Sequence, residues 1–127
     1  MQIYNQDLEK FSDSFRLYDL KVSIVGNPEE FACNHQVNDE IRMEGEIMKF
    51  NKTNSFTIYS LATLLPLLTA KQRISDAHDW INHDDLIACP DPHCKAKFKI
   101  ERTGIRYFRF ADTSGIAFSN KKSKNNP

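Results

Sequence analysis

Residues 15–25, FRLYDLKVSIV, decide the fold class of this chain. Leu20, Val22 and Ile24 alternate there with Lys21 and Ser23. Successive side chains of a strand point to opposite faces, so this alternation predicts a half-buried strand. Gly26-Asn27-Pro28 follows as a turn.

The segments on either side of this strand also favour short strands. Asn38 tolerates a positive φ, so residues 37–41 read as a tight turn that enters a second strand. Gly45 separates this strand from the next, and Thr103-Gly104 reads as a turn between two late strands. We expect these further strands at 40–43, 46–50, 86–88, 96–102, 105–110 and, at an edge, 115–118.

Between these strands the hydrophobic period changes to that of a helix. Ile58, Leu61, Leu65 and Leu68 fall at i, i+3, i+7 and i+10, and Leu64 and Leu67 flank this stripe. The pattern predicts a helix over about residues 57–73. Pro66 lacks a backbone donor, so the helix either kinks there or splits in two. The expected fold is α+β, a small, mostly antiparallel sheet or open barrel with one main helix.

Length and composition predict a single domain. The chain has 127 residues, of which 40% are hydrophobic and 27% charged, as in soluble globular proteins rather than membrane or disordered ones. We expect an N-terminal extension over 1–14, one globular domain over 15–119 and a disordered tail over 120–127.

The charge balance argues against nucleic acid as a partner. Seventeen basic residues meet seventeen acidic ones, whereas nucleic-acid binders usually carry a positive excess. Arg102, Arg106 and Arg109 interleave with aromatic residues, but an ordinary hairpin explains this pattern better. The sequence contains no Gly-rich phosphate loop, nucleophile elbow or HExxH motif.

The start of the chain and its cysteines indicate a cytoplasmic protein. Residues 1–10 have neither the basic start nor the apolar core of a signal peptide, and the apolar stretch 58–68 is too short to span a membrane. Three cysteines, an odd number, favour reduced thiols.

The loop Cys89-Pro-Asp-Pro-His-Cys94 is the most informative stretch for function. Two prolines fix their own φ and restrict the residues before them, so the loop is stiff before any ligand arrives. Thiolate and imidazole are ligands that Zn or Fe prefers. The candidate metal ligands are Cys33, His35, Cys89, His93 and Cys94.

Two other interpretations of these cysteines stay open. In one, Cys33 and Cys89 are small buried hydrophobic residues, and His93 and Cys94 lie in solvent. In the other, Cys89 is the catalytic nucleophile of a thiol enzyme or redox protein and Cys33 is its partner. A second polar cluster, His78, Asp79, His83, Asp84 and Asp85, is better explained as a helix end with aspartate caps around a buried Trp80.

Several of these elements together resemble a small family of uncharacterised bacterial and archaeal proteins. The resemblance covers residues 20–102 and rests on the strand with Lys21-Val22 and on Cys33, Asp39, Leu64, Leu65, Pro66, Cys89, Pro90, Asp91 and Pro92. It implies a fold and a site location but no reaction, because the family has no established activity. The chain departs from the family pattern at Asn38 (usually Gly), at Thr57 (often Cys) and at His93-Cys94.

Three functions follow as expectations. The first is a small binding protein, a homo-oligomer, that holds a transition metal or small ligand near Cys33 and Cys89. The second is a thiol-dependent enzyme or redox protein. The third is a non-catalytic oligomeric interaction subunit that uses the leucine-rich helix or an edge strand.

Overall fold

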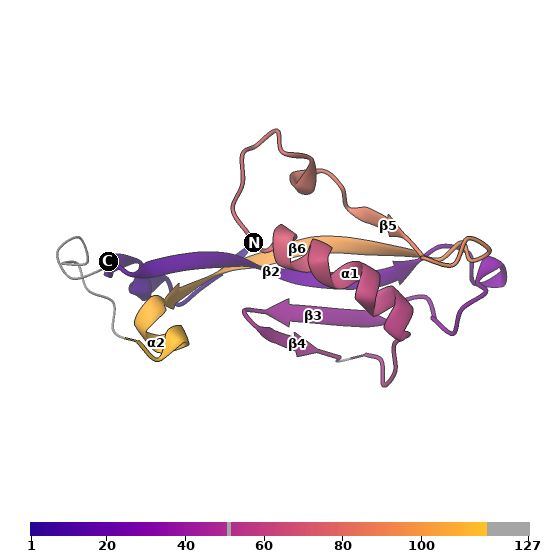
Figure 1. Cartoon of the computed structure of the whole chain (residues 1–127), viewed down its shortest axis with the longest axis horizontal. Coiled ribbons are helices and arrows are strands. Elements are labelled where there is room, and N and C mark those ends of the chain that lie inside the picture. Colours follow the sequence, from indigo (N-terminus) through magenta and orange to yellow (C-terminus); the bar gives the residue numbers. More distant parts are fainter. Residues whose placement is uncertain (51, 117–127) are drawn as a thin grey trace.

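A long antiparallel pair of strands, β2 (Ser14–Val25) and β6 (Lys97–Arg109), forms the spine of the computed structural model (Figure 1). The structure describes residues 1–50 and 52–116. Strand β2 confirms the strand predicted at 15–25, and the exposed fractions of its side chains show the predicted alternation. Leu20, Val22 and Ile24 are each 1% exposed, whereas Lys21 and Ser23 are half-buried on the other face.

The described residues form one mixed sheet of six strands in the order β1-β6-β2-β3-β4, with β5 also paired to β6. Every pairing is antiparallel except that between β1 and β6. The remaining strands are β1 (Gln2–Tyr4), β3 (Glu40–Glu44), β4 (Ile47–Lys49) and β5 (Leu86–Ala88). The helices are α1 (Ile58–Lys71), the short α2 (Phe110–Ser114) and 3-10 turns at Gln6–Lys10, Pro28–Glu30 and Trp80–Asn82. The predicted α+β class is confirmed, with an open sheet.

The turns expected around β3 are confirmed by the backbone. Asn38 has a φ of 74° just before β3, and Gly45 has a φ of 64° between β3 and β4. These are left-handed conformations, which asparagine and glycine adopt at least cost.

The turn predicted at Thr103-Gly104 is wrong, because β6 runs through it as a single strand. Asp19 pairs with Gly104 and Leu20 with Arg102, so Thr103 is an extra residue in a β-bulge. One extra residue moves all later side chains to the opposite face, which breaks the alternation in the sequence just as a turn does. Gly104 is needed for close approach, because a Cβ there would lie 2.9 Å from the backbone oxygen of Gln2 in β1.

Helix α1 crosses one face of the sheet (Figure 1). It begins after Thr57, whose side-chain oxygen accepts a hydrogen bond from the Ser60 N–H (3.1 Å). It continues through Pro66 to Lys71 as one helix, so the predicted split at Pro66 does not occur.

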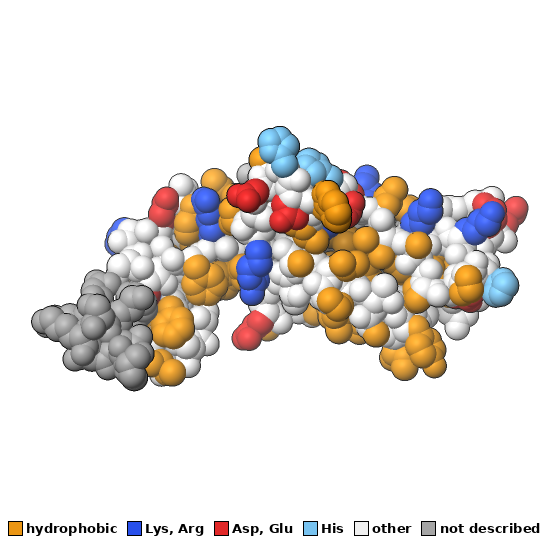
Figure 2. Space-filling model, turned by 45° about the horizontal axis from the view of Figure 1, so that its top comes forward, with side chains coloured by type: hydrophobic (Ala, Val, Ile, Leu, Met, Phe, Trp, Pro, Cys, Tyr) orange, Lys and Arg blue, Asp and Glu red, His pale blue; other side chains and the backbone are white. Residues whose placement is uncertain are grey.

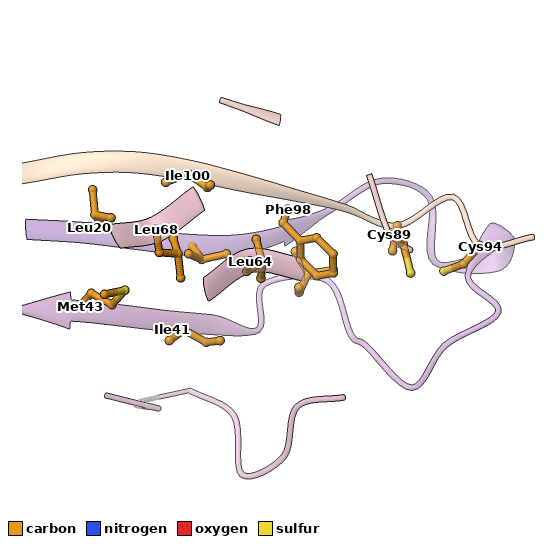
Figure 3. Close-up of a cluster of buried hydrophobic side chains, with 12 residues drawn as sticks. Leu20, Ile41, Met43, Leu64, Leu68, Cys89, Cys94, Phe98 and Ile100 are labelled. Carbon is orange, nitrogen blue, oxygen red and sulfur yellow. The ribbon is translucent and has the colours of Figure 1, made fainter. Parts of the chain in front are cut away.

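The buried face of α1 is rotated relative to the predicted stripe. Leu64 and Leu68 are 0% exposed, whereas Leu65 is 41% and Ile58 71% exposed. The helix also buries Ser60, and this is possible because its hydroxyl is hydrogen-bonded. Leu64 and Leu68 pack against Leu20, Val22, Ile24, Ile41, Met43, Phe98 and Ile100 of the sheet (Figure 3).

Two further expectations in the second half of the chain are corrected. Trp80 is 83% exposed and is not a buried anchor, although Asp79 does cap its turn by accepting from the Ile81 N–H. The strand expected at 105–110 ends at Arg109, because Phe110 begins α2. Residues 117 and 118 of the expected edge strand and the whole predicted tail, 120–127, lie outside the described residues.

Acidic and basic side chains are interspersed over the surface drawn in Figure 2, in line with the balanced composition. Within the described ranges, the structure contains no helix with both the length and the apolar character that crossing a bilayer requires.

Candidate metal centre

The three cysteines converge at one end of the sheet from two separate segments. Cys33 lies in the connection between the Pro28–Glu30 turn and β3. Cys89 directly follows β5, and Cys94 lies in the loop that returns the chain from β5 to β6. Figure 3 shows the sulfur atoms of Cys89 and Cys94 at this end of the core.

The loop over residues 89–96 is held by backbone hydrogen bonds at its base and its tip. The Cys89 N–H donates to the Ala96 carbonyl (3.1 Å) and closes the base, and the Cys94 N–H donates to the Asp91 carbonyl (3.0 Å). The Lys95 N–H donates to the carbonyl of Glu30 (3.1 Å), which fixes this loop to the segment that carries Cys33. The fold therefore places all three thiols through main-chain contacts.

The three sulfur atoms lie within 4.8 Å of one another. The closest pair is Cys33 and Cys94, at 3.1 Å. Cys33 is half-buried, Cys89 is 8% and Cys94 7% exposed. Cys33 and Cys89, on which the sequence-based hypotheses depend, therefore lie close together. The interpretation of the cysteines as structural residues places Cys94 in solvent, and in this respect it is wrong, whereas Cys89 is buried and His93 exposed as it expects.

The pKa values of the Cys33 and Cys94 thiols are shifted in opposite directions, and the hydrogen bond between the two residues contributes to both shifts. Burial raises the pKa of the Cys94 thiol, but the hydrogen bond from Cys33 and backbone hydrogen bonds at Ala96, Ala32 and Cys33 outweigh it and lower that pKa to about 7. Burial and the hydrogen bond to Cys94 raise the pKa of Cys33 to about 11. Cys94 is therefore the thiolate that forms first, with Cys33 as its hydrogen-bond donor.

Neither predicted histidine ligand belongs to this group of sulfur atoms. His35 is 6% exposed, its Nε2 shares a hydrogen bond with the Ser60 hydroxyl (2.9 Å), and its ring lies against Phe56 and Phe98. Burial lowers the pKa of His35, and the Asp39 carboxylate offsets only part of this effect. His93 is exposed, and its backbone N–H donates to the Asp91 carboxylate (2.9 Å).

The second cluster weighed from the sequence, around His78 and His83, forms no comparable group in the described part of the chain. The His83 Nε2 lies 3.1 Å from the Ala77 carbonyl oxygen, within its own loop. The His83 side chain is therefore held by its own loop, next to the Trp80–Asn82 turn that Asp79 caps.

A pocket of about 300 Å³ lies beside the cysteines. It is bounded by the cysteine loop on one side and by the start of α1 on the other, and its lining residues are Cys33, Thr57, Tyr59, Ser60, Cys89, Pro90 and Asp91. Cys94 is not among them. Tyr59 and Ser60 were missed as site residues, because in the sequence they belong to an ordinary helix start with no chemical motif.

Chemically, three close thiols can donate soft ligand atoms to a metal ion or form a disulfide. No known protein-family model, curated protein or solved structure matches the chain. The geometry of the three cysteines is therefore the basis for a functional proposal.

Proposed function

We propose that this protein binds a transition metal ion, Zn²⁺ in the first instance, through the thiolates of Cys33, Cys89 and Cys94. The observation that carries the proposal is the mutual proximity of three sulfur atoms from two distant segments. Tetrahedral zinc with Zn–S bonds of about 2.3 Å holds its sulfurs about 3.8 Å apart. The observed spacing, from 3.1 Å to at most 4.8 Å, brackets this value.

The donor set also narrows the choice of metal. Thiolates favour zinc, Cu(I) and iron–sulfur chemistry over the hard ions Mg²⁺ and Ca²⁺. Without the imidazoles of His35 and His93, the set is softer than the mixed set expected from the sequence. Zn²⁺ is the first candidate and iron the second.

The loop supports binding by its stiffness. Pro90 and Pro92 restrict the chain on either side of Asp91, and the hydrogen bond from Lys95 to Glu30 holds the two cysteine-bearing segments together. Little conformational entropy remains to be lost when a ligand binds. The family that residues 20–102 resemble has no established activity, so the proposal does not depend on it.

The test is metal analysis of protein purified without a metal-affinity column, followed by Co²⁺ titration of metal-free, reduced protein. About one equivalent of metal and thiolate-to-cobalt charge-transfer absorption are expected. Cys89→Ser and Cys94→Ser each abolish tight binding, because two thiolates remain. His93→Gln, a change in the same loop outside the sulfur group, leaves binding unchanged. Less than about a tenth of an equivalent, with no charge-transfer band on titration, contradicts the proposal.

A second candidate function, thiol–disulfide exchange, is favoured by the 3.1 Å contact between Cys33 and Cys94. The Cys94 thiolate attacks an exogenous disulfide and releases one thiol, then Cys33 attacks the mixed disulfide and releases the second. The nucleophile in this scheme is Cys94, not Cys89 as the sequence suggested. Rapid reaction of Cys94 with an aromatic disulfide reagent, faster than that of a cysteine-containing peptide, supports it. A rate equal to the peptide's contradicts it.

A further inference from the structure

The pocket beside the cysteines is asymmetric with respect to the three sulfurs. Cys33 and Cys89 line it, whereas Cys94 does not. An ion held by all three thiolates would therefore adjoin the pocket on the side of Cys33 and Cys89 and the buried Cys94 on the other side. Structural zinc sites are closed by four protein ligands, whereas zinc sites that bind a substrate keep one position open.

From this asymmetry we infer that the metal centre has an open fourth coordination position, which faces the pocket and takes a small exogenous thiol as its thiolate. The inference rests on the proposed function, because it requires a metal bound by the three cysteines. Binding exchanges a water on the metal for the thiolate, and the proton of the thiol goes to solvent. No electron transfer is involved.

The size of the pocket favours a ligand larger than water. A water molecule occupies about 30 Å³ in the liquid, so a pocket of about 300 Å³ holds a molecule of several non-hydrogen atoms. Tyr59 and Pro90 are among the residues that line it. These groups suit the carbon skeleton of a small thiol better than a bare inorganic anion.

The hydroxyl groups of Thr57 and Ser60 in the pocket wall already have hydrogen-bond partners. Thr57 Oγ1 donates to Ser60 Oγ (2.8 Å) and accepts from the Ser60 N–H (3.1 Å). The Ser60 hydroxyl also shares a hydrogen bond with the ring of His35 (2.9 Å). These hydroxyls are therefore not free to act as metal ligands, and the anchor for an incoming molecule is the metal itself.

Asp91 is the internal competitor for the fourth position. It lines the pocket, but one oxygen of its carboxylate accepts the N–H of His93 (2.9 Å) and so orients the side chain toward its own loop. A soft thiolate also matches a three-thiolate zinc centre better than a carboxylate does.

The test uses the full chain loaded with Co²⁺ and titrated with 2-mercaptoethanol, with 1,2-ethanediol as the control in which oxygen replaces sulfur. Saturable growth of the charge-transfer band by about one third, as three thiolates become four, is the expected result, and the diol has no effect. Tyr59→Ala weakens thiol binding several-fold, because it removes part of the wall. Ile58→Ala, a neighbouring and similarly exposed position outside the pocket lining, does not.

The outcomes separate this inference from the proposed function. If the charge-transfer band of the cobalt protein does not change when 2-mercaptoethanol is added, the fourth coordination position is closed. This result overturns the inference of an open position and leaves the proposed metal site standing. If Asp91→Asn then makes that band responsive, Asp91 is the fourth ligand and the inference is overturned in favour of a carboxylate-closed centre. If no charge-transfer band forms with cobalt at all, the proposed metal site fails and the inference fails with it.

Discussion

The sulfur of Cys33 lies 3.1 Å from that of Cys94, although the two cysteines are 61 positions apart in the sequence. Burial, together with the hydrogen bond that the pair shares, raises the pKa of Cys33 to about 11. Burial also raises the pKa of Cys94, but the same hydrogen bond and backbone hydrogen bonds outweigh it and lower that pKa to about 7. A thiolate and a thiol in contact are poised both to bind a soft metal ion and to be oxidised together.

Oxidation of the metal-free protein should link Cys33 to Cys94. These two sulfurs form the shortest pair, and Cys94 supplies the thiolate that attacks first. Mild diamide treatment followed by proteolysis and mass spectrometry identifies the linked peptides. The Cys89→Ser variant forms the same link, and prior loading with Zn²⁺ slows it. A predominant link between Cys33 and Cys89 contradicts this assignment.

Stability should fall in acid through His35. Burial lowers its folded-state pKa, so below the ordinary value of 6.5 the unfolded chain binds a proton that the folded protein resists. The contribution of neutral His35 to the free energy of unfolding is therefore fully present above pH 6.5 and is lost as the pH falls below that value. Urea unfolding of metal-free protein between pH 5 and 8 measures the effect.

Two substitutions test whether His35 causes this slope of the free energy of unfolding against pH. His35→Gln keeps a side chain that can hydrogen-bond Ser60 but removes the titration, so it flattens the dependence around pH 6. His93→Gln changes an exposed histidine and leaves the slope as it is in the unaltered protein. An unchanged slope in His35→Gln rules out His35 as its origin.

Adjacent leucines in α1 should differ sharply in their contribution to stability. Leu64 is 0% exposed in the core and Leu65 is 41% exposed. Leu64→Ala is expected to lower the free energy of unfolding by about 2–5 kcal/mol, whereas Leu65→Ala costs less than about 1 kcal/mol. Similar losses for both variants, measured by chemical denaturation, would place the buried face of the helix elsewhere.

Two glycines with similar backbones provide another matched pair. Gly45 (φ 64°) and Gly115 (φ 71°) both adopt the left-handed conformation, so alanine at either position costs about 1–2 kcal/mol of backbone strain. At Gly45 the new Cβ would also lie 2.9 Å from the ring of Phe108, whereas at Gly115 no atom of residues 1–50 or 52–116 lies within 4 Å of it. Gly45→Ala should therefore be the more destabilising by about 1–3 kcal/mol.

A second substitution separates the clash at Gly45 from its backbone strain. Phe108→Leu removes the atoms nearest the new Cβ, so the double variant should lose less stability than the two single changes predict together. If the stability losses of the two single variants simply add up in the double variant, backbone strain at residue 45 alone explains the cost of Gly45→Ala.

Local sequence patterns predicted strands and turns correctly where the conformation depends on residues that are close together in the chain. The alternation in residues 20–24 predicted β2, and Asn38 and Gly45 predicted the turns around β3. The same reasoning failed at Thr103, because a bulge and a turn interrupt alternation alike, and only the partner strand distinguishes them. It also misplaced the buried face of α1, where six hydrophobic positions left several stripes equally plausible.

By itself the sequence determined an α+β domain with one main helix and a stiff cysteine loop, because these features follow from residues a few positions apart. Tertiary structure decided which candidate ligands meet. Pairing of β5 with β6 and the hydrogen bond from Lys95 to Glu30 bring Cys89 and Cys94 to Cys33, while packing in the core directs His35 toward Ser60 and leaves His93 in solvent. The distance between cysteines so far apart in the chain depends on how the strands pair, and residue spacing carries no information about that pairing.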